Sequence, residues 1–163
     1  MNPVHASFIP ATLVYLFDGD RVLLMKRNKK EKDTHEGKYV GLGGKIEANE
    51  SPLDCAIREV REESGLEVSA SFTKFKGHIY CPKFDKLGRD WLVFVYSCFS
   101  FQGQLNSGCQ EGELHWEKFS DVENLPMWEG DYKFFPYLKS DTVFDMTVRY
   151  DNNKLTDWSL HLI

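Results

Sequence analysis

Three glutamates at helical spacing, Glu59, Glu62 and Glu63, are the residues of this sequence best suited to carry out chemistry. At about 100° per residue they fall within an arc of roughly 100° on one side of a helix. Carboxylates this close repel one another, and a like-charge pair at positions i and i+4 destabilises an isolated helix. A hard divalent cation with oxygen ligands would relieve the repulsion. The spacing therefore indicates a metal site, and the alternative is a solvated acidic face.

The elements around the glutamates favour the metal site. Ser51 is a good N-cap, Pro52 suits the first helical position, and Gly65 can end the helix in a left-handed conformation. The glutamates flank the apolar stripe of this helix instead of opposing it, and a Gly-Gly turn precedes the helix; the stripe is Leu53, Ala56, Ile57 and Val60. Glycines at 43 and 44 let the backbone approach a ligand closely.

The stretch from Gly44 to Leu66, GKIEANESPLDCAIREVREESGL, resembles the Nudix box, and every fixed position of that pattern is filled. The resemblance implies that Glu59 and Glu63 are the principal metal ligands, with Glu62 and the carbonyl of Gly43 as further ligands. It implies Mg²⁺ as the cofactor, with Mn²⁺ as a possible substitute. Two more box residues, Arg58 and Glu50, are implied to be mainly structural, with Arg58 holding carboxylates in place beside the catalytic centre.

Many members of the Nudix superfamily use a further glutamate from a later loop as a metal ligand or base. Glu111 lies five residues before Trp116 in the polar loop 102–112 and is the candidate by spacing. Glu113 is the alternative.

Beyond the box, the chain is similar to MutT-type enzymes, especially the oxidised-purine nucleoside triphosphatases. The likeness rests on three short motifs and an aromatic C-terminal hairpin; the motifs are TLV at 12–14, VGLGGK at 40–45, and LPMW at 125–128 followed by FFP at 134–136. It implies substrate binding by the following residues: Thr12, Lys26, Gly43, Gly44, Lys45, Trp128 and Asp131.

The base-binding residues depart from that subgroup at two positions. Trp128 corresponds to a base-stacking tryptophan and Asp131 to one of two consecutive base-binding aspartates, but Gly130 replaces the other. Val40 stands where animal members have a base-contacting asparagine. Because positions 130 and 40 differ from that subgroup, the base preference of this protein need not be the same. For Trp128, a core aromatic is the alternative interpretation.

The pattern of apolar runs predicts an α/β sandwich around a mixed sheet, and the resemblance implies the Nudix α/β/α sandwich as one domain over residues 1–163. Strands rich in β-formers alternate with turns, and the most apolar run, 91–101, is expected to be a central strand. The other expected strands are 12–17, 21–26, 39–42, one or two within 67–80, 113–119, and a hairpin of 143–150 with 154–163. Residues 130–139 have helical length but are interrupted by Pro136.

Residues 27–38, RNKKEKDTHEGK, form a polar segment that is basic in its first half. We call it the lid segment, because its lysines could close over phosphates. A solvated loop is the alternative. The histidine within it, His35, is assigned no role.

Composition limits the classes of partner. The net charge of -5 over 163 residues argues against general affinity for nucleic acids. No run of 18 apolar residues and no signal-like N-terminus is present, so we expect a cytoplasmic protein without a membrane partner, as a monomer or homodimer. Four widely spaced cysteines (55, 81, 98 and 109) make no metal-ligand pattern and predict free thiols.

The expected reaction follows from these residues. No Ser/His/Asp or Cys/His arrangement is visible, so direct attack by water on a phosphorus is the natural chemistry. The resemblance implies hydrolysis of oxidised purine nucleoside triphosphates, such as 8-oxo-dGTP, to monophosphate and pyrophosphate. The alternatives are a Nudix enzyme acting on ADP-ribose, a nucleotide sugar or a capped RNA end, and a Nudix module that only binds nucleotides.

Overall fold

A twisted mixed sheet forms the centre of the computed structural model, which describes residues 1, 4–107 and 109–163. The strands run in the order β3-β2-β1-β5-β4-β7-β8, with β6 pairing to β2. Their bounds are β1 Ile9–Asp18, β2 Arg21–Lys26, β3 Tyr39–Val40, β4 Thr73–Cys81, β5 Trp91–Cys98, β6 Glu113–Lys118, β7 Phe144–Asp151 and β8 Lys154–Leu162. Parallel pairs (β1 with β5, β4 with β7) alternate with antiparallel ones, so the predicted mixed sheet is confirmed.

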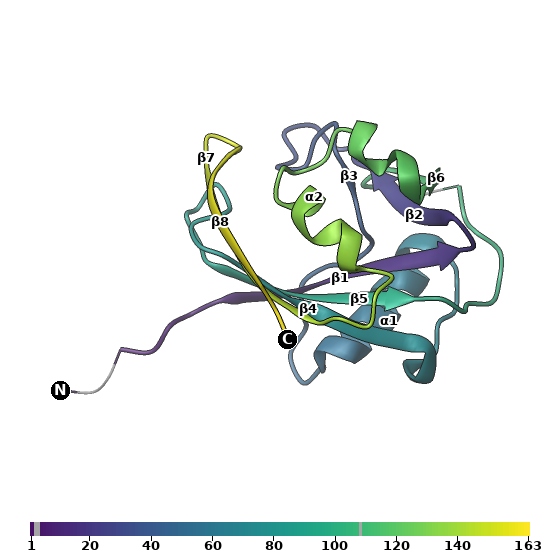
Figure 1. The fold of residues 1–163 in the computed structure, drawn as a ribbon, viewed down its shortest axis with the longest axis horizontal. Coiled ribbons are helices and arrows are strands. Elements are labelled where there is room, and N and C mark those ends of the chain that lie inside the picture. The colour runs from purple at the N-terminus through teal and green to yellow at the C-terminus, as the bar shows by residue number, and fades with distance from the viewer. Residues whose placement is uncertain (2–3, 108) are drawn as a thin grey trace.

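Helices cover both faces of the sheet (Figure 1). The long helix α1 (Pro52–Ser64) lies on one face, and α2 (Asp131–Phe134) lies on the other with the 3₁₀ turns η2 (Phe119–Asn124) and η3 (Phe135–Tyr137). Alternate side chains of β1 pack on the two faces of the sheet, because successive side chains of a strand point to opposite faces. Val14 packs in the cluster with α1, and Tyr15 packs in the cluster with α2. Strand β1 is therefore buried on both faces, as its apolar run predicts.

The sequence placed most elements correctly and misjudged some of their extents. The segment 67–80 yields one strand, preceded by the 3₁₀ turn η1 (Ala70–Phe72), and a β-bulge lies between Phe75 and Gly77. The segment 130–139 is broken as predicted, because α2 ends at Phe134 and η3 contains Pro136. The C-terminal hairpin forms, but its apolar residues Trp158 and Leu162 stay 45% and 49% exposed.

The four cysteines are free thiols, and three of them (55, 81 and 98) are buried. None of the helices within the described ranges is long and apolar enough to cross a membrane.

Candidate active site

Helix α1 fixes the candidate glutamates through its two ends. Ser51 accepts a hydrogen bond from the N–H of Asp54 at 3.1 Å and so caps the N-terminus. Gly65 adopts φ 76° and closes the C-terminus with its N–H on the carbonyl of Arg61. Ala56 and Val60 are fully buried against β1 and its neighbours, and this holds the acidic side of the helix toward the glycine turn.

The glycine turn at 43 and 44 needs both of its glycines. A Cβ on Gly43, which has φ 151°, would lie 1.9 Å from the carbonyl oxygen of Thr12. A Cβ on Gly44 would lie 2.3 Å from Oε1 of Glu59. The N–H of Gly43 donates to Oε2 of Glu63 at 3.3 Å. The turn therefore brings backbone and two box carboxylates into contact: a side chain at position 43 would clash with backbone, and one at position 44 would displace the Glu59 carboxylate.

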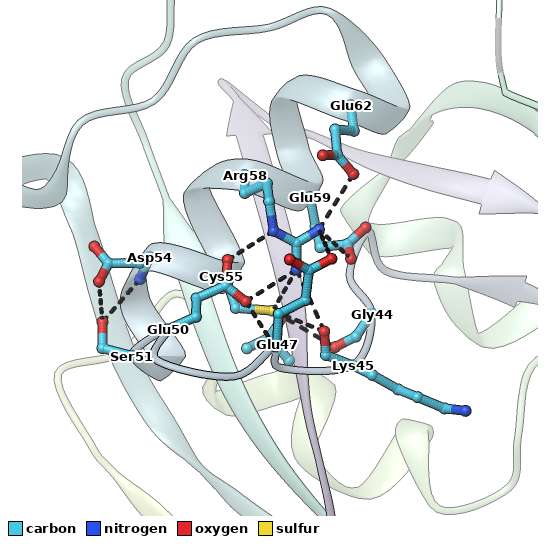
Figure 2. A network of polar contacts seen from close by, with 11 residues as sticks. Gly44, Lys45, Glu47, Glu50, Ser51, Asp54, Cys55, Arg58, Glu59 and Glu62 are labelled. Carbon is cyan, nitrogen blue, oxygen red and sulfur yellow. Dashed lines mark hydrogen bonds and ion pairs between the residues drawn. The ribbon is translucent and has the colours of Figure 1, made fainter.

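Arg58 is the centre of the polar network in Figure 2. Its Nε donates to Glu50 at 2.6 Å, and its Nη1 donates to Glu59 at 2.9 Å and to Glu62 at 3.2 Å. The hydrogen bonds that Arg58 donates to Glu50 lower the pKa of Glu50 to about 2. The guanidinium thus holds two of the three box glutamates, as implied for a residue that keeps carboxylates in place.

Glu63 is the most deeply buried carboxylate of the box, with 8% of its surface exposed. Burial, together with the negative charges of Glu59 and Glu111, raises its pKa to about 9. Burial also raises the pKa of Glu59, although its hydrogen bond with Arg58 acts in the opposite direction. Both shifts have the same physical basis: carboxylates share a partly desolvated site without enough positive charge.

The structure favours Glu111 over Glu113 as the additional acidic residue. The negative charge of Glu111 contributes to raising the pKa of both Glu59 and Glu63, whereas Glu113 has no such effect on either. Glu113 is paired in register with Lys26 on β2, and its carboxylate lies 3.4 Å from His115.

The donors suit Mg²⁺ in chemistry, since all are carboxylate or carbonyl oxygens. Within residues 1, 4–107 and 109–163, no three His, Cys, Asp or Glu side chains stand close enough together to hold a metal ion without adjustment. Glu63 accepts a hydrogen bond from the Gly43 N–H, and the negative charges of Glu59 and Glu111 act on it more strongly than the positive charge of Arg27. A divalent cation would supply the positive charge that this set of carboxylates lacks.

The remaining substrate-binding candidates near the turn have mixed surroundings. Thr12 is 2% exposed, its hydroxyl lies 3.4 Å from Sγ of Cys55, and its backbone N–H donates to the Gly44 carbonyl at 2.9 Å. The Lys45 carbonyl accepts a hydrogen bond from Arg58, and the Lys45 side chain extends away from the network (Figure 2). The Lys45 ammonium lies 5.6 Å from the ring centroid of Trp91. The ammonium of Lys26 lies over the ring of Tyr39, 5.9 Å from its centroid.

Trp128 stands in the structure as a largely buried aromatic. It is 5% exposed, and the rings of Phe84 and Tyr150 meet it edge-on at 5.2 and 5.0 Å. The ammonium of Lys38 lies 4.9 Å from its ring centroid. Trp128 also lines a cavity of about 420 Å³ between residues 32–36 of the lid segment, residues 83–86 and the β7–β8 turn.

Gly130 is the N-cap residue of α2, and Asp131 is the first residue of this helix. Among the described residues, no group hydrogen-bonds to the Asp131 carboxylate, and burial raises its pKa to about 7. A Cβ on Gly130 would lie 2.7 Å from Oη of Tyr150, which accepts the Gly130 N–H at 2.9 Å. Tyr150 therefore takes the space that a second aspartate would need, and this explains the departure at position 130.

Comparison with known protein families agrees with this geometry. The model of the NUDIX domain matches residues 7–138. The chain belongs to the Nudix hydrolase family. Within this family it is 35% identical over 112 residues to the uncharacterized Nudix hydrolase YvcI of Bacillus subtilis, covering 69% of this chain and 67% of that protein. It is 29% identical to a protein named oxidized purine nucleoside triphosphate hydrolase from Mus musculus, covering 91% of this chain and 92% of the relative.

A further match is shorter. A protein named NAD-capped RNA hydrolase NudC from Pseudomonas aeruginosa is 42% identical over 60 residues, which is 37% of this chain and 20% of that one. Among solved structures, a MutT protein from Bacillus halodurans superposes with a TM-score of 0.80 at 31% identity, covering 93% of this chain and 96% of that one. The predicted Nudix fold, with its central mixed sheet, is thereby confirmed.

Sequence reasoning missed three residues of this Nudix hydrolase that lie in or beside the lid segment. Arg27 forms ion pairs with Asp33 at 2.6 Å and with Glu111 at 3.0 Å. His35, to which no role was assigned, accepts a hydrogen bond from Nε1 of Trp128 at 2.8 Å. The only signal in the sequence was their place in a cationic segment after β2, and that does not identify their partners.

His35 should make the stability of this Nudix hydrolase depend on pH. Burial and the positive charge of Arg27 lower its pKa to about 4, with Asp33 opposing and Lys38 adding to the shift. Between pH 6.5 and 4 the unfolded chain binds the proton and the folded chain does not, so stability falls as pH falls through that window.

We expect the free energy of unfolding to drop by about 1–2 kcal/mol more between pH 7 and pH 5 in the parent than in His35→Gln. Glutamine can still accept the Trp128 hydrogen bond but does not titrate. Urea titrations at the two pH values measure the difference, and identical pH dependence in both proteins would contradict it.

Proposed function

We propose that this Nudix hydrolase is a Mg²⁺-dependent pyrophosphohydrolase of purine nucleoside triphosphates, including oxidised ones such as 8-oxo-dGTP. The products are the nucleoside monophosphate and pyrophosphate. The observation that carries the proposal is the contact of two box carboxylates with the glycine turn, Glu63 with the N–H of Gly43 and Glu59 beside Gly44, with the charge of Glu111 acting on both. Such a set of oxygen donors can bind a divalent cation, which in turn binds phosphate oxygens.

The proposal assigns the residues of the site to metal binding, orientation of carboxylates and phosphate binding. Glu59, Glu63 and Glu111 would hold the metal, with Glu62 and the Gly43 carbonyl as further donors. When bound, Mg²⁺ neutralises phosphate charge and makes a water more acidic. Arg58 keeps Glu59 and Glu62 oriented. Lys26 and the lysines of the lid segment would contact the polyphosphate.

A nucleophile from the protein is not part of the proposal. Cys55 is the thiol nearest to the turn, and its Sγ lies 3.7 Å from the Gly44 carbonyl oxygen. Burial raises the pKa of this thiol to about 11, so it stays protonated and unreactive at neutral pH. Direct hydrolysis by water is the remaining route.

The base would bind near Trp128 and Asp131. The cavity lined by Trp128 gives an opening toward this region, and the Asp131 carboxylate is free of other partners among the described residues. An ionised carboxylate accepts hydrogen bonds only, so it matches the adjacent N1–H and N2–H₂ donors of guanine. For a base to stack on Trp128, the lid segment and Lys38 must move away from its ring.

The share of each chain that is matched favours a triphosphate substrate over the alternatives. The match to the relative named for oxidised purine nucleoside triphosphates spans 91% of this chain and 92% of that protein. The matches to NudC proteins cover a small part of those longer chains: 20% of the protein from Pseudomonas aeruginosa and 38% of the one from Pseudomonas fluorescens. An ADP-ribose or capped-RNA enzyme therefore remains the second choice.

The products of a triphosphate test the reaction. With Mg²⁺ and a panel of oxidised guanine, guanine, adenine and pyrimidine triphosphates, we expect monophosphate and pyrophosphate in equal amounts from the preferred substrates. Anion-exchange chromatography with ³¹P NMR separates these from diphosphate and orthophosphate. Orthophosphate as the primary product would contradict the proposal, as would turnover of ADP-ribose far above that of every triphosphate.

A further inference from the structure

Arg27 joins two parts of the molecule that lie far apart in the sequence. It follows β2 directly, and its guanidinium binds Asp33 of the lid segment through Nε and Glu111 of the later loop through Nη1, at 2.6 and 3.0 Å. The Asp33 and Arg27 side chains are only 9% and 14% exposed, whereas Glu111 is 37% exposed. The ion pair with Asp33 is thus shielded from water, whereas the ion pair with Glu111 is more exposed.

Glu111 needs such a partner. Its charge is repelled by Glu59 and Glu63, and it sits in a loop before β6 whose described residues 103–107 and 109–112 form no helix or strand. The same loop is attached to the lid segment at a second point, where Nζ of Lys29 donates to the carbonyl of Cys109 at 3.2 Å. Without these attachments, repulsion would favour conformations in which Glu111 turns into solvent.

We propose that Arg27 is a positioning residue that holds Glu111 beside the box glutamates and links its placement to the lid segment through Asp33. A guanidinium suits this task, because its planar fork can bind two carboxylates in fixed directions at once, whereas a lysine ammonium is a single point of charge. Partners that orient a ligand without touching the metal commonly change metal affinity or activity by about 10–100-fold when removed.

Two other roles for Arg27 make different predictions. If it only bound substrate phosphate, its loss would raise KM and leave metal binding unchanged. If it only sequestered Glu111, its loss would free a carboxylate and tighten metal binding. Under the positioning role, its loss weakens metal binding and lowers kcat, and the effect requires Glu111.

The test is Mn²⁺ binding to the whole protein without substrate, by isothermal titration or by electron paramagnetic resonance. We expect Arg27→Gln and Glu111→Gln each to weaken Mn²⁺ binding about tenfold. The double variant should be no weaker than Glu111→Gln alone, because both changes remove the same contact. Arg27→Lys and Asp33→Asn should show smaller losses of the same sign. The matched control is Arg89→Gln, which breaks another Arg–Asp pair at residues 85 and 89.

Kinetics provide the second measurement. We expect kcat to fall with Mn²⁺ affinity across these variants while KM changes less than about threefold. Tighter Mn²⁺ binding in Arg27→Gln, unchanged binding, or multiplicative losses in the double variant would each overturn the inference. If Arg27→Gln does not fold by circular dichroism, Arg27→Lys and Asp33→Asn carry the same test.

The inference rests on the metal role proposed for Glu111, and the variants separate the two. If Glu63→Gln weakens Mn²⁺ binding and Glu111→Gln does not, the inference on Arg27 fails while the proposed reaction stands. If no triphosphate is hydrolysed, the binding experiment still reports on Arg27, because it uses the metal alone.

Discussion

Glu63→Gln and Glu59→Gln should each lower kcat at least about a hundredfold. Each change removes one negative charge from the set of oxygens proposed to hold the metal, and that set stabilises charge in the transition state. Glu63 should show the larger effect, because it is buried and faces both Glu59 and Glu111. Steady-state pyrophosphate release at saturating Mg²⁺ measures the loss.

The fold should tolerate these changes. Glutamine keeps a carbonyl oxygen that can accept the Gly43 N–H now donated to Glu63. Circular dichroism and thermal unfolding of the variants should match the parent within a few degrees. Glu67→Gln is a matched control, since Glu67 is exposed just after the same helix. Activity within tenfold of the parent in both box variants would rule out the assigned metal site.

Asp131→Ala should lower kcat/KM for guanine-type triphosphates by about 10–100-fold, which corresponds to the 1–3 kcal/mol of a good bidentate contact. Pyrimidine triphosphates should change little, because they lack the adjacent pair of donors. Burial raises the pKa of Asp131 to about 7, so its protonation state changes near neutral pH. The guanine preference over adenine should therefore increase from pH 6 to pH 8, as the carboxylate ionises and can only accept.

Competition between guanine-type, adenine and pyrimidine triphosphates at the two pH values measures this preference. Asp131→Asn is the informative companion, because it has similar size and does not titrate. A guanine-to-pyrimidine ratio unchanged by Asp131→Ala would show that Asp131 does not read the base. The same pH dependence in Asp131→Asn would assign it to another group.

What the sequence could predict was largely local. The caps at Ser51 and Gly65, the glycine turn and the sides of α1 follow from residues a few positions apart, and each formed as expected. The apolar run at 91–101 was enough to place a central strand, because burial on both faces requires a continuous apolar sequence. The break at Pro136 follows from the chemistry of proline alone.

Contacts between distant segments could not be predicted in this way. The Arg27–Glu111 ion pair joins residues 84 positions apart by way of the β2–β6 pairing, which the sequence does not specify. The His35–Trp128 hydrogen bond likewise depends on how the lid segment folds back. The reason for glycine at position 130 became clear only when Tyr150 was found in the space beside it. Each is a tertiary contact between polar groups that carry no periodic signal.

The most direct test of the account is a metal titration of the metal-free protein. Pyrophosphate release from 8-oxo-dGTP or dGTP should be absent in excess chelator, rise with added Mg²⁺ to saturation in the parent, and stay at least about a hundredfold lower in Glu63→Gln at every Mg²⁺ concentration. Release of pyrophosphate at the parental rate in the presence of chelator, or full recovery of Glu63→Gln at high Mg²⁺, would contradict a catalytic metal held by these carboxylates.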